Sequence, residues 1–218
     1  MTEEEKGKKA PGCKVVLLGD TGVGKTCIIS RYISGLFDIN TASTNGASYC
    51  SKKIDYEKLN KTIMLDIWDT AGQEKYKSLT KFFYKDAKVA ILVYDITLRK
   101  SYENIKEYWY QQIQENGDKK MILAIAGNKC DLYEKEAVPE EVAREFAQSI
   151  GALFGLTSAA NNTGINNLFF DAVYKYLDPN FQQKIQQEKE EKEEITGQKI
   201  TLDKNKVKKE KKKKSSFC

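Results

Sequence analysis

The residues best suited to chemistry lie near the N-terminus, where the sequence fits the pattern GxxxxGK[ST] directly after the apolar run 15–18. Glycines without a Cβ atom let a loop turn tightly and point its N–H groups at phosphate oxygens, beside the positive end of a helix. Lys25 would reach the β and γ phosphates, and the Thr26 hydroxyl would bind Mg²⁺. We therefore predict a nucleoside triphosphate site, the alternative being an ordinary strand-to-helix turn. Its predicted residues are Gly19, Asp20, Thr21, Gly22, Val23, Gly24, Lys25, Thr26 and Cys27.

A second candidate group follows the apolar run 63–68, where Asp69 and Gly72 are spaced as Asp-x-x-Gly. An aspartate at the end of a strand suits Mg²⁺, directly or through water, and the N–H group of a glycine can approach a γ phosphate. Because Asp-x-x-Gly is also a common turn, this pattern is weak evidence on its own. It supports a nucleotide site only together with the GxxxxGK[ST] pattern.

The sequence GNKCD, which contains Asn128 and Asp131, indicates which base the nucleotide carries. The carboxylate of Asp131 can accept two N–H bonds, from N1 and N2 of guanine, a pattern that adenine cannot offer. A loop at Ser158 and Ala159, after another predicted strand, would present N–H groups to guanine O6. The alternatives are that Asn128 and Asp131 only cap a turn, and that the chain is an ATP-using enzyme.

The order of the predicted elements is typical of an α/β protein. Five apolar runs alternate with helical segments, which predicts a mostly parallel sheet with helices on both faces. The runs are 15–18, 63–68, 89–94, 122–126 and 153–156, and the helices are expected after Lys25 and at 101–116, 140–149 and 165–177. The polar stretches 40–48 and 71–77 are predicted loops, and mobile loops beside a phosphate site are candidates for a switch.

Composition excludes several kinds of enzyme and partner. The 218 residues suit one domain plus an appendage, and the absence of histidine rules out Ser-His-Asp and Cys-His nucleophiles and HExxH zinc sites. The five cysteines form no CxxC pair. The net charge of +5 lies entirely in residues 184–218, which hold 12 of the 36 basic and 7 of the 31 acidic residues. The balanced remainder argues against a nucleic-acid-binding face. The lack of an apolar signal or spanning run predicts a protein that is cytoplasmic or attached to the cytosolic face of a membrane.

These motifs, in this order, resemble the small GTPases of the Ras superfamily, and the fragments WDTAGQE at 68–74 and VYDIT at 93–97 resemble its Rab family. The resemblance leans toward the endosomal Rabs. It implies a single P-loop GTPase domain with a mostly parallel six-stranded sheet and helices on both faces. We accordingly predict three regions: a disordered extension at 1–11, the small GTPase domain at 12–177 and a flexible polybasic tail at 178–218.

The resemblance also assigns roles to single residues. Thr44 is then the threonine that closes on Mg²⁺ and the γ phosphate, and Phe37 leans against guanine. Lys129 flanks the base, and Gln73 orients the attacking water. As alternatives, Thr44 is an ordinary loop residue and Phe37 a core aromatic. Ala160 stands where the family usually has a lysine that packs near the base. The metal ligands would be Thr26, Thr44 and Asp69, and the catalytic residues Gln73 and Lys25.

The implied function is a GTP/GDP switch that binds GTP, hydrolyses it slowly and regulates vesicle and membrane trafficking. Exchange factors, GAPs, a GDP-dissociation inhibitor and effectors would bind a monomer through its two switches. The aromatic triad that effectors contact would be Tyr49, Trp68 and Phe83; the alternative for any one of them is an ordinary core residue. Asn45 replaces the usual aliphatic residue beside the switch threonine, which alters the surface that partners contact. The alternative function is a module that binds GTP or GDP with little or no hydrolysis.

The tail contains a lysine-rich run, KNKVKKEKKKK at 204–214, followed by SSFC. Rab proteins end in prenylated cysteines, so Cys218 is a candidate lipidation site, with a free terminal thiol as the alternative. One lipid binds a membrane only marginally, and the lysines would supply a second signal on an anionic surface. A nuclear-localisation or solubilising role for the run is the other alternative. We expect the protein on the cytosolic face of endomembranes.

Overall fold

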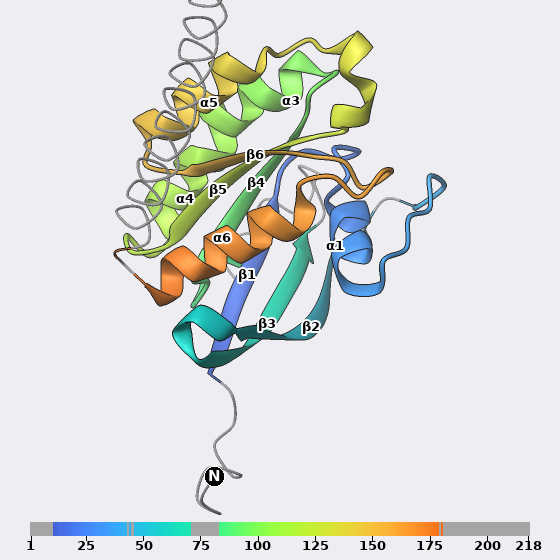
Figure 1. Cartoon of the computed structure of the whole chain (residues 1–218). Helices are drawn as coiled ribbons and strands as arrows, with labels where there is room; N and C mark the ends of the chain where they lie inside the picture. Colours follow the sequence, from blue (N-terminus) through green and yellow to red (C-terminus); the bar gives the residue numbers. More distant parts are fainter. Residues whose placement is uncertain (1–10, 43, 45, 71–82, 179, 181–218) are drawn as a thin grey trace, which may run out of the picture. The chain divides into compact units, whose positions relative to one another are not determined.

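The computed structural model of the chain describes residues 11–42, 44, 46–70, 83–178 and 180. At its centre is a six-stranded sheet in the order β2-β3-β1-β4-β5-β6 (Figure 1). The strands are β1 (Gly12–Leu18), β2 (Ala47–Tyr56), β3 (Lys61–Thr70), β4 (Val89–Asp95), β5 (Ile122–Asn128) and β6 (Leu153–Thr157). β2 and β3 are antiparallel, and the other neighbouring strands are parallel. The predicted α/β fold with a mostly parallel six-stranded sheet is therefore confirmed.

Helices cover both faces of this sheet (Figure 1). They are α1 (Lys25–Ser34), α3 (Arg99–Asn104), α4 (Tyr110–Asn116), α5 (Glu140–Ser149) and α6 (Ile165–Leu177), with a π turn, η4 (Ile105–Trp109), and two 3-10 turns, η2 (Glu57–Leu59) and η5 (Cys130–Lys135). α1 and α6 share one face, where the rings of Tyr32 and Phe169 stack with centroids 4.0 Å apart. α3, α4 and α5 cover the other, where Tyr94 of β4 meets Tyr102 of α3 edge to face. β4 is buried along its whole length because helices cover both of its faces.

β1 lies where the strand order reverses. It pairs with β3 on one side and with β4 on the other, so that Val15 is opposite both Ile67 and Val89. In open α/β sheets, ligands bind in the crevice at the carboxyl ends of the strands on either side of such a reversal. The loop 19–24 begins at this end of β1 and leads into α1. The fold thus places the predicted phosphate-binding pattern at the ligand-binding edge of the sheet.

The predicted helices are confirmed, with one irregularity. The helices expected at 140–149 and 165–177 coincide with α5 and α6. The helix expected at 101–116 starts two residues earlier, at Arg99, and changes to a π turn between α3 and α4. The hydrophobic periodicity of this segment gave no sign of that turn.

One predicted loop is partly wrong. Ala47 and Ser48, at the end of the predicted loop 40–48, belong to β2. This strand lies at the edge of the sheet and is exposed along most of one face, so it lacks the apolar run by which the other strands were recognised. The predicted loop 71–77 lies outside the described residues. The chain divides into two compact units, Met1–Leu177 and Asp178–Cys218, while the predicted limits of extension, domain and tail stay predictions.

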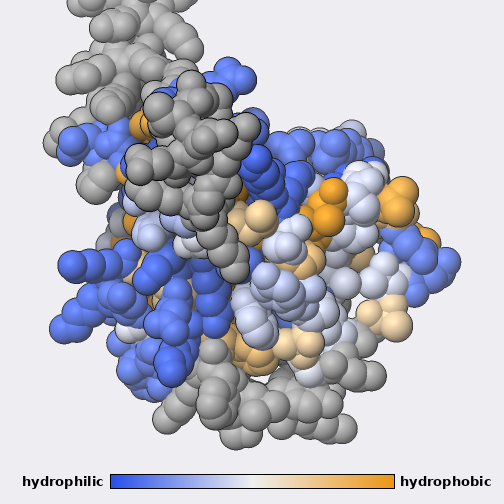
Figure 2. Space-filling view, turned by 90° about the horizontal axis from the view of Figure 1, so that it is seen from below, coloured by the Kyte–Doolittle hydropathy of each residue, from blue (hydrophilic) through white to orange (hydrophobic). Residues whose placement is uncertain are grey.

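Among the described residues visible in Figure 2, no large apolar face is seen. The coloured residues there are mainly hydrophilic, and the apolar ones form small separate groups. In the part of the chain that the structure describes, no helix is both long and apolar enough to cross a membrane.

Candidate nucleotide-binding site

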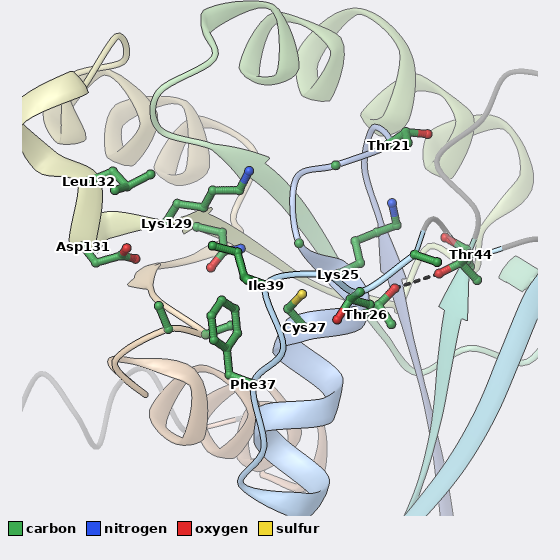
Figure 3. A pocket seen from close by; sticks show the side chains of 18 residues that line it. Thr21, Lys25, Thr26, Cys27, Phe37, Ile39, Thr44, Lys129, Asp131 and Leu132 are labelled. Carbon is green, nitrogen blue, oxygen red and sulfur yellow. Dashed lines mark hydrogen bonds between the residues drawn. The ribbon is translucent and has the colours of Figure 1, made fainter.

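A cavity of about 460 Å³ opens at the carboxyl ends of the central strands (Figure 3). Lys25, Thr26 and Thr44 lie at one end of it, which we call the phosphate end. Phe37 and Asp131 lie at the other, the base end. Its lining consists of Thr21, Gly22, Gly24, Lys25, Thr26, Cys27, Phe37, Ile39, Thr41, Ala42, Thr44, Thr70, Asn128, Lys129, Asp131, Leu132, Ala159 and Ala160. The volume and the elongated arrangement suit a nucleotide, because ligand pockets commonly measure about 300 to 1,000 Å³.

The loop before α1 needs glycine at two positions. Gly19 has φ of 146°, and a Cβ atom there would lie 2.1 Å from the carbonyl oxygen of Val93. Gly24 has φ of 97°, and its Cβ atom would lie 2.4 Å from Nδ2 of Asn128. A side chain at either position would therefore be strained and would collide with β4 or β5. These two close approaches shape a loop that ends at the N-terminus of α1, whose first N–H groups have no partner within the helix and attract anions.

Lys25, the first residue of α1, crosses back over this loop. Its side chain is buried, and Nζ donates hydrogen bonds to the carbonyl oxygens of Gly19, at 2.8 Å, and Asp20, at 2.9 Å. Burial lowers the pKa of Lys25 from 10.5 to about 8, and the carboxylates of Asp69 and Asp20 partly oppose that shift. At neutral pH the ammonium is therefore mostly charged, and it lies on the wall of the phosphate end.

Three side chains bring oxygen atoms together beside this lysine. The hydroxyls of Thr26 and Thr44 lie 2.7 Å apart, and both donate to Oδ2 of Asp69, at 2.7 Å and 3.0 Å. Asp69 is buried, and its other oxygen, Oδ1, has no hydrogen-bond partner among the described residues. Through these contacts the side chain of Thr44 is held against α1 and β3.

This oxygen cluster fits Mg²⁺, which prefers hard oxygen ligands and is usually held by only one or two carboxylates together with phosphate and water. The unpartnered Oδ1 of Asp69 is a buried acceptor that a cation would satisfy. No group of three or more His, Cys, Asp or Glu side chains that could hold a metal occurs within the described residues. The two threonine hydroxyls and the single carboxylate therefore form the candidate cation site.

Asn128 joins the loop to the base end. Its buried side chain donates through Nδ2 to the carbonyl oxygen of Val23, at 2.7 Å, and accepts through Oδ1 from the hydroxyl of Thr157, at 3.2 Å. The amide thus bridges residues 105 positions apart in the sequence rather than capping a local turn. An amide is suited to this position because one side chain can donate and accept at once.

Asp131 is oriented by the loop after β6. The buried hydroxyl of Ser158 donates to Oδ1 of Asp131. The loop itself is closed by two backbone bonds between Ser158 and Thr163, of 3.0 Å and 3.1 Å. Next to it, Nζ of Lys129 pairs with Oδ2 of Asp95 at 2.7 Å. The base end is therefore lined by a carboxylate in a fixed orientation, which suits it to accept the N–H groups of guanine.

The sequence did not predict a role for Arg31, which extends from α1 and stabilises the base end through hydrogen bonds. Its Nε donates to the carbonyl oxygen of Ala159 at 2.7 Å, its Nη2 to that of Ala160 at 3.1 Å, and its Nη1 to that of Gly35. The guanidinium carbon lies 5.8 Å from the ring centroid of Phe37. Arg31 thus links the two walls between which a base would lie, although it does not line the cavity itself.

The structure brings most of the predicted residues together. Thirteen of the predicted site residues line the cavity. The others that are described lie behind the lining: they are Gly19, Asp20, Val23, Asp69 and Ser158. Three predicted residues lie outside the described residues: Gly72, Gln73 and Cys218. The lining residues that were not predicted are Ile39, Thr41, Ala42, Thr70 and Leu132. Thr70 and Leu132 directly follow predicted residues, which is a signal that could have found them.

Comparison with known proteins agrees with this geometry. Residues 14–178 match the Ras family. Ras-related protein Rab-22A of Homo sapiens is 43% identical over 159 residues, which cover 72% of this chain and 80% of that protein. Ras-related protein Rab-31 of Rattus norvegicus is 45% identical over 157 residues, covering 72% and 78%, and Ras-related protein Rab5 of Nicotiana tabacum is 42% identical over 158 residues, also covering 72% and 78%. The chain therefore belongs to the Ras family and, within it, to the Rab small GTPases, which bind and hydrolyse GTP and regulate membrane trafficking.

Proposed function

We propose that this Rab GTPase is a Mg²⁺-dependent switch in which Thr44 responds to the γ phosphate, and that its tail attaches it to the cytosolic face of endosomal membranes. The observation that carries the switch is the cluster of Thr26, Thr44 and Asp69, which holds the side chain of Thr44 at the phosphate end. The guanine base would lie at the base end against Asp131, with the phosphates in the loop 19–24.

Hydrolysis requires fixed positive charge around the γ phosphate, because the transition state spreads negative charge over its oxygens. Lys25 would supply an ammonium ion, and the N–H groups of the loop and of the first turn of α1 would supply preorganised dipoles. Bound by the oxygen cluster, Mg²⁺ would neutralise charge that develops on the phosphates. We assign to Gln73 the task of orienting the attacking water, and to the N–H group of Gly72 a contact with the γ phosphate.

Loss of the γ phosphate would remove one reason for Thr44 to stay at the phosphate end, and the segment 37–44 would be released. We propose that effectors bind beside this segment, at the triad of aromatic rings. The ring centroids of Tyr49 and Trp68 lie 5.5 Å apart and those of Trp68 and Phe83 6.4 Å apart, and Tyr49 is 55% exposed. Neither switch stretch of the sequence contains arginine, so a GAP would supply the missing charge, with exchange factors and a GDP-dissociation inhibitor as the other regulators.

For the tail, we propose prenylation of Cys218 together with binding of the lysine-rich run 204–214 to anionic lipid. The support is the sequence alone, in which the excess positive charge is confined to the tail. Each lysine near an anionic leaflet contributes about 1 kcal/mol, so the run could add to the weak binding of a single lipid chain.

Single-turnover hydrolysis of GTP tests the proposed switch. We expect the parent chain to hydrolyse bound GTP slowly, and the Gln73→Leu variant to be slower still, with or without a Rab GAP. Chelation of Mg²⁺ should speed the release of GDP from the parent. Thr26→Ala should release GDP quickly even in excess Mg²⁺, whereas Thr62→Ala, on β3 and bonded to Asp55, should not.

The outcomes separate the switch from a module that only holds nucleotide. Hydrolysis by Gln73→Leu at the parent rate would contradict the assignment of that residue. GDP release that is indifferent to chelation would contradict the proposed metal site. Absence of hydrolysis in the parent, with and without GAP, would leave only the binding module.

A further inference from the structure

The carboxylate of Asp20 is bound from outside the nucleotide site. Its Oδ2 accepts a hydrogen bond from Nδ2 of Asn104 at 2.6 Å, and its Oδ1 accepts one from Nε1 of Trp109 at 2.9 Å. Asp20 lies in the phosphate-binding loop, but its side chain does not line the cavity. Both oxygens are instead taken up by the helical segment that follows β4. This segment lies 84 and 89 residues away in the sequence.

The π turn explains how two residues five positions apart reach the same carboxylate. In a regular α-helix each residue turns by about 100°, so Asn104 and Trp109 would point about 140° apart. Trp109 is instead the last residue of η4 (Ile105–Trp109), which begins directly after Asn104 and is closed by a hydrogen bond from the N–H group of Tyr110 to the carbonyl oxygen of Ile105. Hydrogen bonds that join residues five apart place such residues one turn above each other, on nearly the same side. The irregularity in the helix therefore serves the contact with Asp20.

Asp20 is thus held at both ends. Its carboxylate is bound by the helix, and its backbone carbonyl accepts the hydrogen bond from Nζ of Lys25. The residue before it, Gly19, has the positive φ at which the loop first bends. A residue fixed through both its side chain and its main chain at the first bend restricts the positions open to the rest of the loop.

We propose that Asn104 and Trp109 are positioning residues for the nucleotide, acting through Asp20 to hold the loop 19–24 in the conformation that binds phosphate. The proposal rests on the proposed phosphate contacts of that loop. It extends the functional site to a helix that contributes no residue to the cavity lining. Trp109 also packs in the hydrophobic core, so its contribution to the loop must be separated from its contribution to stability.

A double-mutant cycle on the full chain makes that separation. Asp20→Ala removes the acceptor, and Trp109→Phe removes one donor while keeping an aromatic ring in the core. Loss of a hydrogen bond to a charged group commonly changes an equilibrium about tenfold or more. We expect each variant to speed the release of labelled GDP about tenfold. If Trp109 acts through Asp20, the double variant should also be about tenfold faster than the parent, not about a hundredfold.

Two control variants address packing and the turn itself. Ile113→Val shortens a buried side chain of α4 that packs in the same hydrophobic core as Trp109, and should lower the thermal midpoint without changing GDP release. Glu107→Ala changes an exposed residue of the π turn and should change neither. If Asp20→Ala does not fold, the cycle between Asn104→Ala and Trp109→Phe replaces it, because both donors act on one carboxylate.

The outcomes are distinct from a failure of the proposed function. Parent-like GDP release by Trp109→Phe, or a hundredfold effect in the double variant, would overturn the positioning role. Release of GDP from Lys25→Ala at the parent rate would instead overturn the phosphate contacts of the loop. A non-additive cycle, with Ile113→Val releasing GDP like the parent, is the result that supports the inference.

Discussion

Replacing Arg31 by alanine should weaken the binding of GDP and GTP to the same extent. The bond from Nε to the carbonyl oxygen of Ala159 is partly buried, and the bonds to Ala160 and Gly35 are exposed. Water can replace an exposed bond at little cost, whereas a partly buried bond to a charged donor is worth about 2 kcal/mol. If that energy orders the loop for the base, affinity should fall about thirtyfold.

The dissociation rates of labelled GDP and of a non-hydrolysable GTP analogue measure this effect. Because the lost contacts lie at the base end, both rates should rise together and their ratio should stay at the parent value. Arg31→Lys keeps the charge, but lysine lacks the planar guanidinium that reaches three carbonyls. Its dissociation rates should therefore lie between those of the parent and of Arg31→Ala. Affinity within twofold of the parent, or a loss confined to the GTP analogue, would refute the reasoning.

Three further predictions concern the base, the phosphates and the tail. Asp131→Asn should shift preference from guanine toward xanthine nucleotides, measured by competition, and unchanged preference would remove the assignment of the base contact. Burial lowers the pKa of Lys25 to about 8. Nucleotide affinity should therefore be constant below about pH 8 and fall above it, by up to about tenfold per pH unit, as the ammonium loses its proton. Measurement of nucleotide affinity from about pH 7 to about pH 9 checks the direction of this change. Cys218→Ser should move the protein from membranes to the cytosol in a eukaryotic cell, and a parent found on membranes with an unmodified thiol would contradict prenylation.

The fold could be predicted where burial leaves a pattern in the sequence. β4 and β5 are nearly continuous apolar runs because helices cover both faces of these strands. α5 and α6 were predicted with the bounds that the structure shows. β2 was missed because an exposed edge strand carries polar residues. The π turn was missed because one additional residue in a turn barely changes the spacing of apolar positions over a single helix.

The nucleotide site was predictable where its chemistry resides in contiguous residues. A loop that surrounds phosphates with its own N–H groups needs glycines and a lysine at fixed spacing, and Gly19, Gly24 and Lys25 show that spacing. The contact of Thr44 with Thr26 required the resemblance to a family, because a loop threonine has no pattern of its own. No sequence pattern indicated the role of Arg31, because its partners are backbone carbonyls, which every residue possesses.

The residues that hold the site in shape were harder to predict from the sequence than those that would touch the nucleotide. Asn128 reaches Val23 across 105 residues, Arg31 reaches Ala159 across 128, and Trp109 reaches Asp20 across 89. Two of these three contacts end on a backbone carbonyl, so the identity of the acceptor residue is unconstrained and no spacing in the sequence records the pair. Each contact nevertheless joins a loop of the nucleotide site to a helix or strand that is distant in the sequence. Nucleotide affinity in this GTPase should therefore depend on helix residues with no contact to the nucleotide, and a change at Arg31 of α1 or at Trp109 of the π turn should alter GDP release while leaving the sequence motifs intact.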